Sequence, residues 1–179
     1  MNFDFDDEEF ERDVKIKVVG VGGGGGNAVE NMVRNNVEGV DFIIINTDVA
    51  ALKSKDGNTM ERVQIGRKTT KGRGAGGKPP VAAESAKENS DDIAEVLKGA
   101  SLVFVAAGMG GGTGTGAAPV IAQIAKDMGI LTVGVVTKPF DFEREFKMNL
   151  ALQGIAELRK YVDALIIVPC LLYTSDAAD

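Results

Sequence analysis

The glycine-rich segment at residues 108–116 constrains the fold more than any other part of the chain. It reads Gly-Met-Gly-Gly-Gly-Thr-Gly-Thr-Gly, and it lies between an apolar run at 102–107 and an apolar helical pattern at 117–128. A strand, a glycine loop and a helix in this order direct the unpaired N–H groups of the helix start towards an anion. A flexible linker would not be set between an apolar strand and an apolar helix. We therefore predict that this loop binds phosphate.

Apolar runs alternate with amphipathic patterns along the whole chain. Strands are predicted at 14–19, 40–45, 62–65, 102–107, 130–136 and 164–168, and helices at 27–37, 49–53, 80–98, 117–128 and 142–161. Near-continuous apolar strands are typical of parallel sheets that are covered on both faces. We expect an α/β fold with a mostly parallel, Rossmann-like sheet of six strands. Such a sheet binds its ligands outside the carboxyl ends of the strands.

Details of two helices can also be predicted. Pro119 fits the first turn of the helix at 117–128, where its missing N–H would have no intrahelical partner, and Gly129 is expected to end that helix. In the charged helix at 142–161, the residues expected to pack against the core are Phe146, Leu150, Leu152, Ile155 and Leu158.

Composition excludes several kinds of chemistry. The 179 residues are 44% hydrophobic, which suffices for one domain with a substantial core. The chain has no histidine and one cysteine, Cys170. These counts exclude Ser-His and Cys-His nucleophile pairs, histidine metal sites and an internal disulfide.

Charge and hydropathy bear on location and partners. The net charge of −6 arises within residues 1–13, which we expect to form an acidic, disordered arm. Neither this arm nor the neutral remainder has the basic excess of a nucleic-acid-binding surface, so we expect no nucleic-acid partner. No apolar run approaches the roughly 20 residues of a membrane span, and no secretory leader opens the chain. We expect a soluble, cytoplasmic protein without direct membrane contact.

Two other glycine loops allow alternative interpretations. The segment at 20–25 satisfies the dinucleotide fingerprint, and Asp48 would be its ribose-binding acid, so an NAD-dependent oxidoreductase domain is one alternative. The segment at 72–78 almost spells a P-loop, but Pro79 replaces the Ser or Thr that would hold Mg²⁺. We interpret 72–78 as a mobile loop that closes over phosphates.

Four motifs in order resemble the FtsZ family, the tubulin-like GTPases of bacterial cell division. They are Gly-Val-Gly-Gly-Gly-Gly-Gly-Asn-Ala at 20–28, Asn-Thr-Asp at 46–48, Gly-Gly-Gly-Thr-Gly-Thr-Gly-Ala-Ala-Pro at 110–119 and Thr-Lys-Pro-Phe-Asp-Phe-Glu at 137–143. The resemblance covers residues 14–169, which we expect to form one nucleotide-binding domain. The last ten residues, 170–179, do not match the family, and we expect them to mark a truncation or a spurious terminus.

The resemblance implies which residues hold the nucleotide. Ala75 and Gly76 match the loop that senses the third phosphate. Lys147 stands where the family has a nucleotide-contacting arginine, so the charge is kept but the bidentate fork is lost. Without the resemblance, Glu143 and Lys147 would be interpreted as an i,i+4 pair on a solvated helix face. The implied nucleotide-binding residues are Gly23, Gly24, Gly25, Gly26, Asn27, Gly111, Gly112, Thr113, Gly114, Thr115, Glu143 and Lys147.

The resemblance also implies an activity and partners. The parent protein is expected to bind GTP and GDP with Mg²⁺ carried on the nucleotide, to polymerise head-to-tail, and to hydrolyse GTP in the division ring at mid-cell. Its division partners and membrane tethers would bind a C-terminal tail beyond this chain. The activating acidic loop is also expected beyond it, so we assign no catalytic residue here and expect weak or no hydrolysis. A further alternative is a filament subunit or inhibitor that binds nucleotide without turnover.

Overall fold

The structure is a computed structural model that describes residues 14–53, 60–140 and 144–169. The expectations for the acidic arm at 1–13, for residues 170–179 and for Glu143 lie outside these residues.

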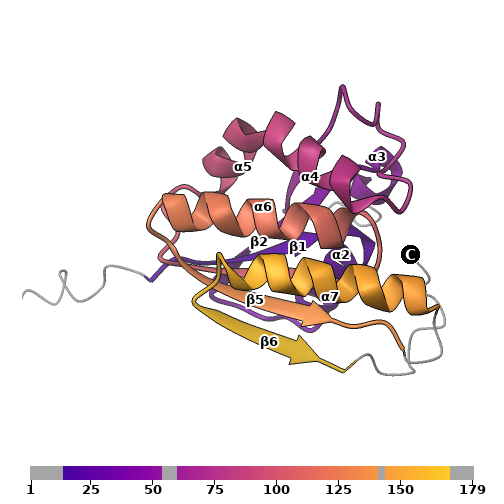
Figure 1. Cartoon of the computed structure of the whole chain (residues 1–179). Helices are drawn as coiled ribbons and strands as arrows, with labels where there is room; N and C mark the ends of the chain where they lie inside the picture. The colour runs from indigo at the N-terminus through magenta and orange to yellow at the C-terminus, as the bar shows by residue number, and fades with distance from the viewer. Residues whose placement is uncertain (1–13, 54–59, 141–143, 170–179) are drawn as a thin grey trace, which may run out of the picture.

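A single parallel sheet forms the centre of the domain (Figure 1). The strand order is β3-β2-β1-β4-β5-β6, and each neighbouring pair is parallel. This is the order of the doubly wound nucleotide-binding folds, so the predicted fold class is confirmed. The strands are β1 (Ile16–Val21), β2 (Val40–Asn46), β3 (Glu61–Gln64), β4 (Leu102–Gly108), β5 (Leu131–Thr137) and β6 (Ala164–Val168).

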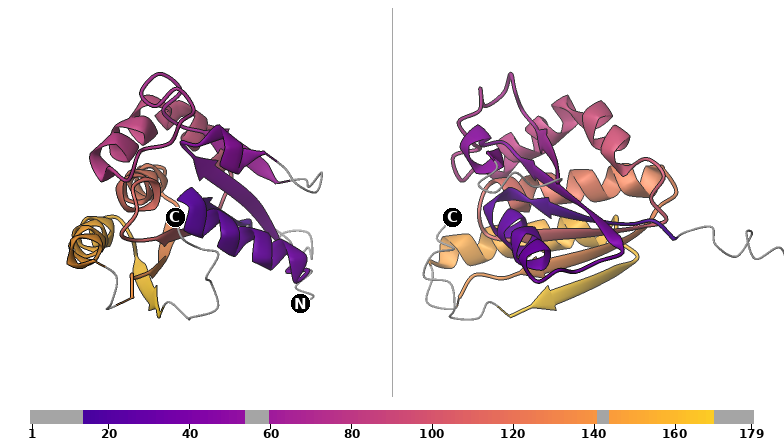
Figure 2. Two further views of the ribbon diagram at one scale, coloured as in Figure 1. Left: turned by 90° about the vertical axis from the view of Figure 1, so that its right-hand side faces the viewer. Right: turned by 180° about the vertical axis from the view of Figure 1, so that it is seen from behind.

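Helices cover both faces of the sheet (Figure 2). Helix α2 packs against β1, β2 and β4 on one face, and α6 packs against β1, β4 and β5 on the other. Helices α4, α5 and α7 pack on α6 and thicken that side of the domain. The helices are α2 (Gly22–Arg34), α3 (Val49–Leu52), α4 (Pro79–Glu88), α5 (Ser90–Leu97), α6 (Thr113–Asp127) and α7 (Glu145–Arg159).

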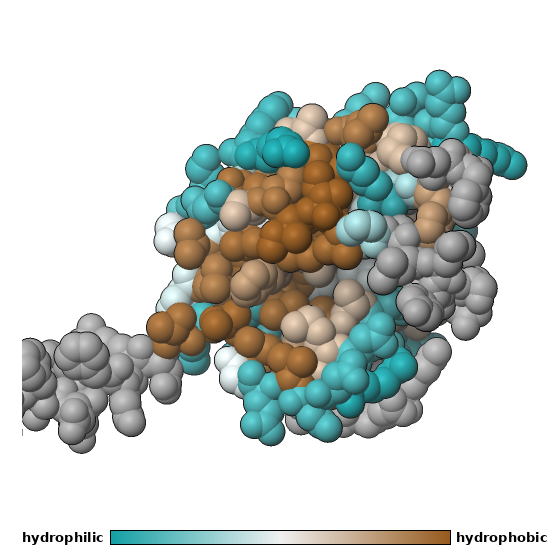
Figure 3. Space-filling view, turned by 90° about the horizontal axis from the view of Figure 1, so that it is seen from below, coloured by the Kyte–Doolittle hydropathy of each residue, from teal (hydrophilic) through white to brown (hydrophobic). Residues whose placement is uncertain are grey.

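Alternate strand residues supply two separate cores. Val19 and Val21 of β1 belong to the large core under α6, whereas Val18 packs with Val29 of α2 on the opposite face. On the α2 side, the far end of the sheet carries exposed apolar residues, including Leu131 and Ile166. Figure 3 shows apolar side chains gathered over one face of the molecule.

The two glycine-rich helices begin earlier than predicted. Helix α2 starts at Gly22 rather than at residue 27, and α6 starts at Thr113 rather than at residue 117. Glycine is a poor helix former, so the sequence pattern alone favours loops at both places. Packing of these turns against the strand ends overrides that preference. Pro119 consequently lies inside α6 and not in its first turn, and the carbonyl of Thr115 cannot accept from residue 119.

Three other predictions about helices can be compared with the structure. Gly129 ends α6 as predicted, with φ of 75° and its N–H bonded to the Lys126 carbonyl. The helix predicted at 80–98 is two helices, which meet at Asn89. In α7, Phe146 and Leu152 are exposed, and the buried residues are Ala151, Gly154, Ile155 and Leu158.

The first turns of α2 approach the sheet so closely that one glycine cannot carry a side chain. A Cβ atom on Gly25 would overlap the backbone carbonyl oxygen of Ala106 in β4. Gly26, the next residue, has room, because its nearest neighbour would be the Ile44 Cγ2 atom at 3.6 Å. Whether a side chain is tolerated therefore differs from one glycine of this run to the next.

Alanine substitution at these two glycines should have opposite effects on stability. Gly25→Ala should lower the free energy of unfolding by about 1–3 kcal/mol, because backbone atoms must move to relieve the overlap. Gly26→Ala should leave it unchanged or raise it by about 0.5–1 kcal/mol, because alanine favours helix. Urea unfolding followed by circular dichroism measures both, and equal effects would contradict the packing described.

Candidate functional site

A cavity of about 580 Å³ opens at the carboxyl ends of β1, β2 and β4. Its volume lies within the range of small-molecule sites. Four segments line it: the start of α2, the turn after β2, the loop before α4, and the segment between β4 and α6. The start of α7 closes one side. The site thus lies where the parallel sheet predicts it, at the switch point between β1 and β4.

Two helix N-termini meet at this cavity. Gly23 and Gly24 of α2 line it, as do Thr113 and Gly114 of α6. The residues before the two helices, Val21 and Gly112, carry no side-chain oxygen and make no capping hydrogen bond. The first N–H groups of both helices therefore remain available to an anion, with the positive end of each dipole behind them.

The Asn-Thr-Asp turn after β2 is held in place by its own side chains. The Asn46 Oδ1 atom accepts from the N–H groups of Thr47 at 2.8 Å and Asp48 at 3.2 Å. Asp48 in turn accepts from the Ala50 N–H at 2.9 Å, which caps α3. The Thr47 hydroxyl lies 2.8 Å from the Thr113 hydroxyl. This last hydrogen bond joins β2 to the start of α6 across the floor of the site.

Thr115 shapes the glycine loop from beneath. Its side chain is buried, and its Oγ1 atom accepts from the Gly110 N–H at 2.8 Å. The neighbouring Met109 N–H donates to the Thr137 carbonyl of β5 at 2.9 Å. Gly110 has a φ of 109°, which side chains rarely adopt. The loop between β4 and α6 is thus held between the sheet and its own helix.

The loop at 66–78 forms the wall opposite α2. Gly74, Ala75, Gly76 and Gly77 line the cavity, and the backbone of Arg73 bridges that of Asp48. At the far end of the loop, the Glu88 carboxylate accepts from the Thr69 hydroxyl and from the N–H groups of Lys68 and Thr69. The Thr69 hydroxyl, followed by the Lys68 N–H, lowers the pKa of Glu88 below its usual value.

The charge around the cavity is mostly positive. Arg73, Arg144 and Lys147 line it, and Asp48 is the single carboxylate among the lining residues that the structure describes. Within the same described residues, no group of three or more histidine, cysteine, aspartate or glutamate side chains could hold a metal ion. The site is therefore suited to a polyanion.

The structure brings together most of the sequence-predicted site residues. Gly23, Gly24, Gly111, Gly112, Thr113, Gly114 and Lys147 line the cavity. Gly25 and Gly26 are buried against the sheet, Asn27 is exposed on α2, and Thr115 lies under the loop. These residues shape or flank the cavity without lining it.

The sequence interpretation did not assign Arg73, Arg144 or Phe146 to the site, and it expected Phe146 to pack against the core; all three line the cavity. Arg144 directly precedes α7, and Phe146 is 67% exposed near the opening. A signal existed for Arg144, because it comes three residues before Lys147 at the same helix start. No sequence signal distinguishes Arg73 from the other basic residues of its loop.

Comparison with known families decides between the interpretations of the glycine loops. Residues 15–170 match the family described as "Tubulin/FtsZ family, GTPase domain". This chain belongs to the tubulin/FtsZ family. The comparisons do not support the NAD-dependent oxidoreductase alternative, although the sheet order is shared with dinucleotide-binding folds.

Known proteins match this chain in both sequence and structure. The cell division protein FtsZ of Wigglesworthia glossinidia brevipalpis is 59% identical over 143 residues, which are 80% of this chain and 37% of that protein. An FtsZ dimer structure from M. jannaschii has a TM-score of 0.83 at 39% identity and covers 92% of this chain and 49% of that one. The GTPγS-bound protofilament of CetZ2 from Haloferax volcanii has a TM-score of 0.76 at 27% identity, with coverage of 87% and 49%.

This chain thus spans 37% of the length of the FtsZ relative from Wigglesworthia. None of the helices that the structure describes is long and apolar enough to cross a membrane.

The hydrogen bond between Thr47 and Thr113 should appear as a coupling energy in this tubulin/FtsZ domain. Thr47→Val or Thr113→Val alone leaves a hydroxyl without its partner, whereas the double variant removes both. Urea unfolding of the two single variants and the double variant should give a coupling of about 0.5–1.5 kcal/mol. Strictly additive effects would contradict the bond.

Proposed function

We propose that this domain binds a guanine nucleotide through its phosphates and that the intact protein is a GTPase that polymerises. The observation that supports it best is the meeting of two uncapped helix N-termini at one cavity lined by Arg73, Arg144 and Lys147. Many N–H donors acting together suit a chain of phosphates better than a single anion. The preference for guanine rests on membership of the tubulin/FtsZ family.

Each lining segment has a proposed role. Gly23 and Gly24 would donate N–H groups to the phosphates from one side, and Gly111 to Gly114 from the other. Loop residues Ala75 and Gly76 would contact the third phosphate. Thr115 would hold the glycine loop in shape, while the buried Gly25 and Gly26 would seat α2 on the sheet. Asn27, exposed beside them, would complete the loop around the phosphates. Glu143, outside the described residues, would contact the ribose.

The residues present fit an Mg²⁺ ion that arrives on the nucleotide. Asp48 is the single carboxylate among the described lining residues, and one of its oxygens is already bonded to the Ala50 N–H. Mg²⁺ in such sites is held mainly by phosphate oxygens and water. When bound, the ion would neutralise phosphate charge during phosphoryl transfer.

The described residues are equipped to bind the nucleotide and to stabilise charge. Backbone N–H groups fixed by the sheet need no reorganisation as charge develops on the transferred phosphoryl group. Asp48 is poorly placed to act as a general base, because its carboxylate caps α3. We therefore propose that hydrolysis in the intact protein takes place at an interface between subunits, where a second copy supplies the groups that position water.

The proposal also covers the partner and the location of the intact protein. The proposed partner is a further copy of the protein in a head-to-tail filament, and CetZ2 was solved as a protofilament. Relatives named cell division protein FtsZ support a role in division, and the proposed location is the cytoplasm at mid-cell. Other division proteins and membrane tethers are proposed to bind the remainder of the intact protein.

Competition between nucleotides tests the proposed ligand. Trinitrophenyl-GTP should bind the chain with a rise in fluorescence, GTP and GDP should displace it, and NADH should not. Addition of the chain to an intact FtsZ should also alter polymerisation measured by light scattering. Binding of NADH without competition from GTP would refute the proposal.

Removal of the Lys147 charge should weaken nucleotide binding. Lys147→Ala should lower the affinity for GDP by about 3- to 10-fold, because an exposed cation gains less than a buried one from its phosphate contact. Lys147→Arg should bind at least as tightly, since guanidinium can form a bidentate contact. Lys87→Ala, an exposed lysine on α4 away from the cavity, is the matched control. An equal loss in Lys87→Ala would rule out a local role for Lys147.

A further inference from the structure

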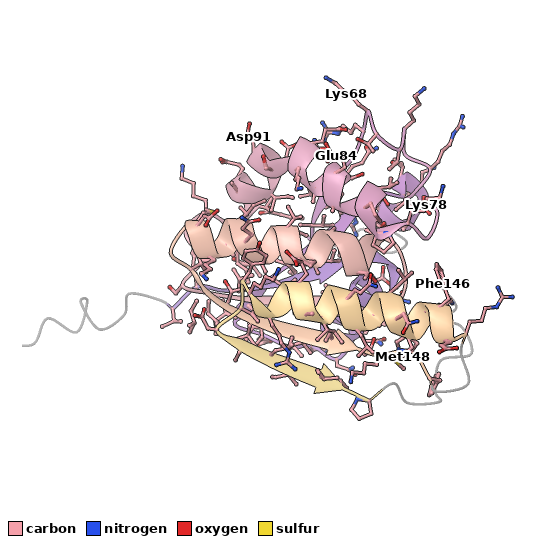
Figure 4. All side chains as sticks on the ribbon, viewed as in Figure 1. Lys68, Lys78, Glu84, Asp91, Phe146 and Met148 are labelled. Atoms are coloured by element: carbon pink, nitrogen blue, oxygen red, sulfur yellow. The ribbon has the colours of Figure 1, made fainter. Side chains whose placement is uncertain are left out.

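The loop at 66–78 is attached to both ends of helix α4. At its beginning, the Gly66 N–H donates to the Asn89 Oδ1 atom at 2.8 Å, directly after α4. At its end, Lys78 precedes Pro79, the first residue of α4. A helix of 10 residues is about 15 Å long, so Asn89 lies about that far from Pro79, where the loop ends beside the start of α6. Figure 4 shows Lys68 and Lys78 at separate ends of this loop, with Glu84 on the helix.

Glu88 anchors the beginning of the loop. One carboxylate oxygen accepts from the Lys68 N–H at 3.0 Å, and the other accepts from the Thr69 N–H at 3.0 Å and the Thr69 hydroxyl at 2.7 Å. Bonds to an ionised acceptor are stronger than bonds between neutral groups. We call residues 66–70, which the bonds to Glu88 and Asn89 hold, the stem. The Thr70 hydroxyl also donates to the Thr47 carbonyl at 3.3 Å, and this bond joins the stem to the turn after β2.

The rest of the loop has little conformational preference of its own. We call residues 71–77 the tip; Gly72, Gly74, Gly76 and Gly77 all have φ between 62° and 86°. Glycine populates this region freely, so the sequence of the tip does not fix its conformation. The tip lines the cavity and reaches the start of α6, where a Cβ on Gly112 would lie 2.9 Å from the Gly77 Cα. Its position must therefore be imposed by its attachments.

We propose that Glu88 is a positioning residue for the third phosphate of the bound nucleotide. By fixing the stem at one end of α4, Glu88 limits the conformations of the glycine-rich tip at the other end. The tip then presents its N–H groups to the part of the cavity that a triphosphate fills and a diphosphate leaves open. This inference rests on the proposed nucleotide-binding function, and it gives a role to a side chain that does not line the cavity.

Comparison of two nucleotides tests this role in the full chain. Glu88→Ala should weaken binding of mant-GMPPNP, a non-hydrolysable triphosphate, by about 3- to 10-fold. Binding of mant-GDP should change by less than about twofold. Glu88→Gln keeps an oxygen for Thr69 but not for Lys68, so it should be intermediate. Glu84→Ala removes an exposed carboxylate from the same helix and is the matched control.

Limited proteolysis measures the anchoring without any nucleotide. Trypsin should cleave after Arg67, Lys68, Lys71 and Arg73 faster in Glu88→Ala than in the wild type or in Glu84→Ala. Equal cleavage rates would overturn the anchoring role.

The outcomes separate this inference from the proposed function. If the wild type binds both nucleotides and Glu88→Ala changes neither, or weakens both equally, the positioning role is wrong and the nucleotide site stands. If the wild type binds neither nucleotide, the proposed function fails and the positioning role fails with it.

Discussion

Contact between backbone and backbone at the ends of β1 and β4 determines the rest of this structure. The first turns of α2 lie directly on β4, where Gly25 meets the Ala106 carbonyl. Such contact is possible only without a side chain, and it places two helix starts next to each other at neighbouring strand ends. The glycines therefore allow two helix dipoles to converge, and the positive ends of these dipoles add to the charges of Arg73, Arg144 and Lys147 at the cavity.

The sequence was sufficient to predict the fold because its strands are strongly patterned. All six strands were predicted, since runs such as Phe42 to Ile45 are too apolar and too short for any other interpretation. The starts of α2 and α6 were missed because glycine propensity opposes helix and only packing against the sheet reverses it. The exposure of Phe146 and Leu152 was missed because a charged helix with apolar residues on several sides does not reveal which face packs.

The site could be predicted from the sequence to the extent that its lining residues lie in local motifs. The glycine loops and Lys147 belong to such motifs, and the structure brings them to one cavity. Arg73 and Glu88 depend on how the loop at 66–78 folds along α4, and that path is set by hydrogen bonds between segments about 20 residues apart. Hydrogen bonds of this kind leave no periodicity or motif in the sequence.

The pairing of β1 with β4 links this site to how the chain folds. Residue 16 pairs with residue 102 although α2, β2, α3, β3, α4 and α5 all lie between them. Closing so long a segment is slow, and the cavity is complete only after it has happened, because its lining comes from the ends of both strands. A ligand that binds only the native state stabilises it, by about 2.7 kcal/mol when present at 100 times its dissociation constant. A ligand that meets this description would couple its own concentration to the stability of the domain as well as to the occupancy of the cavity.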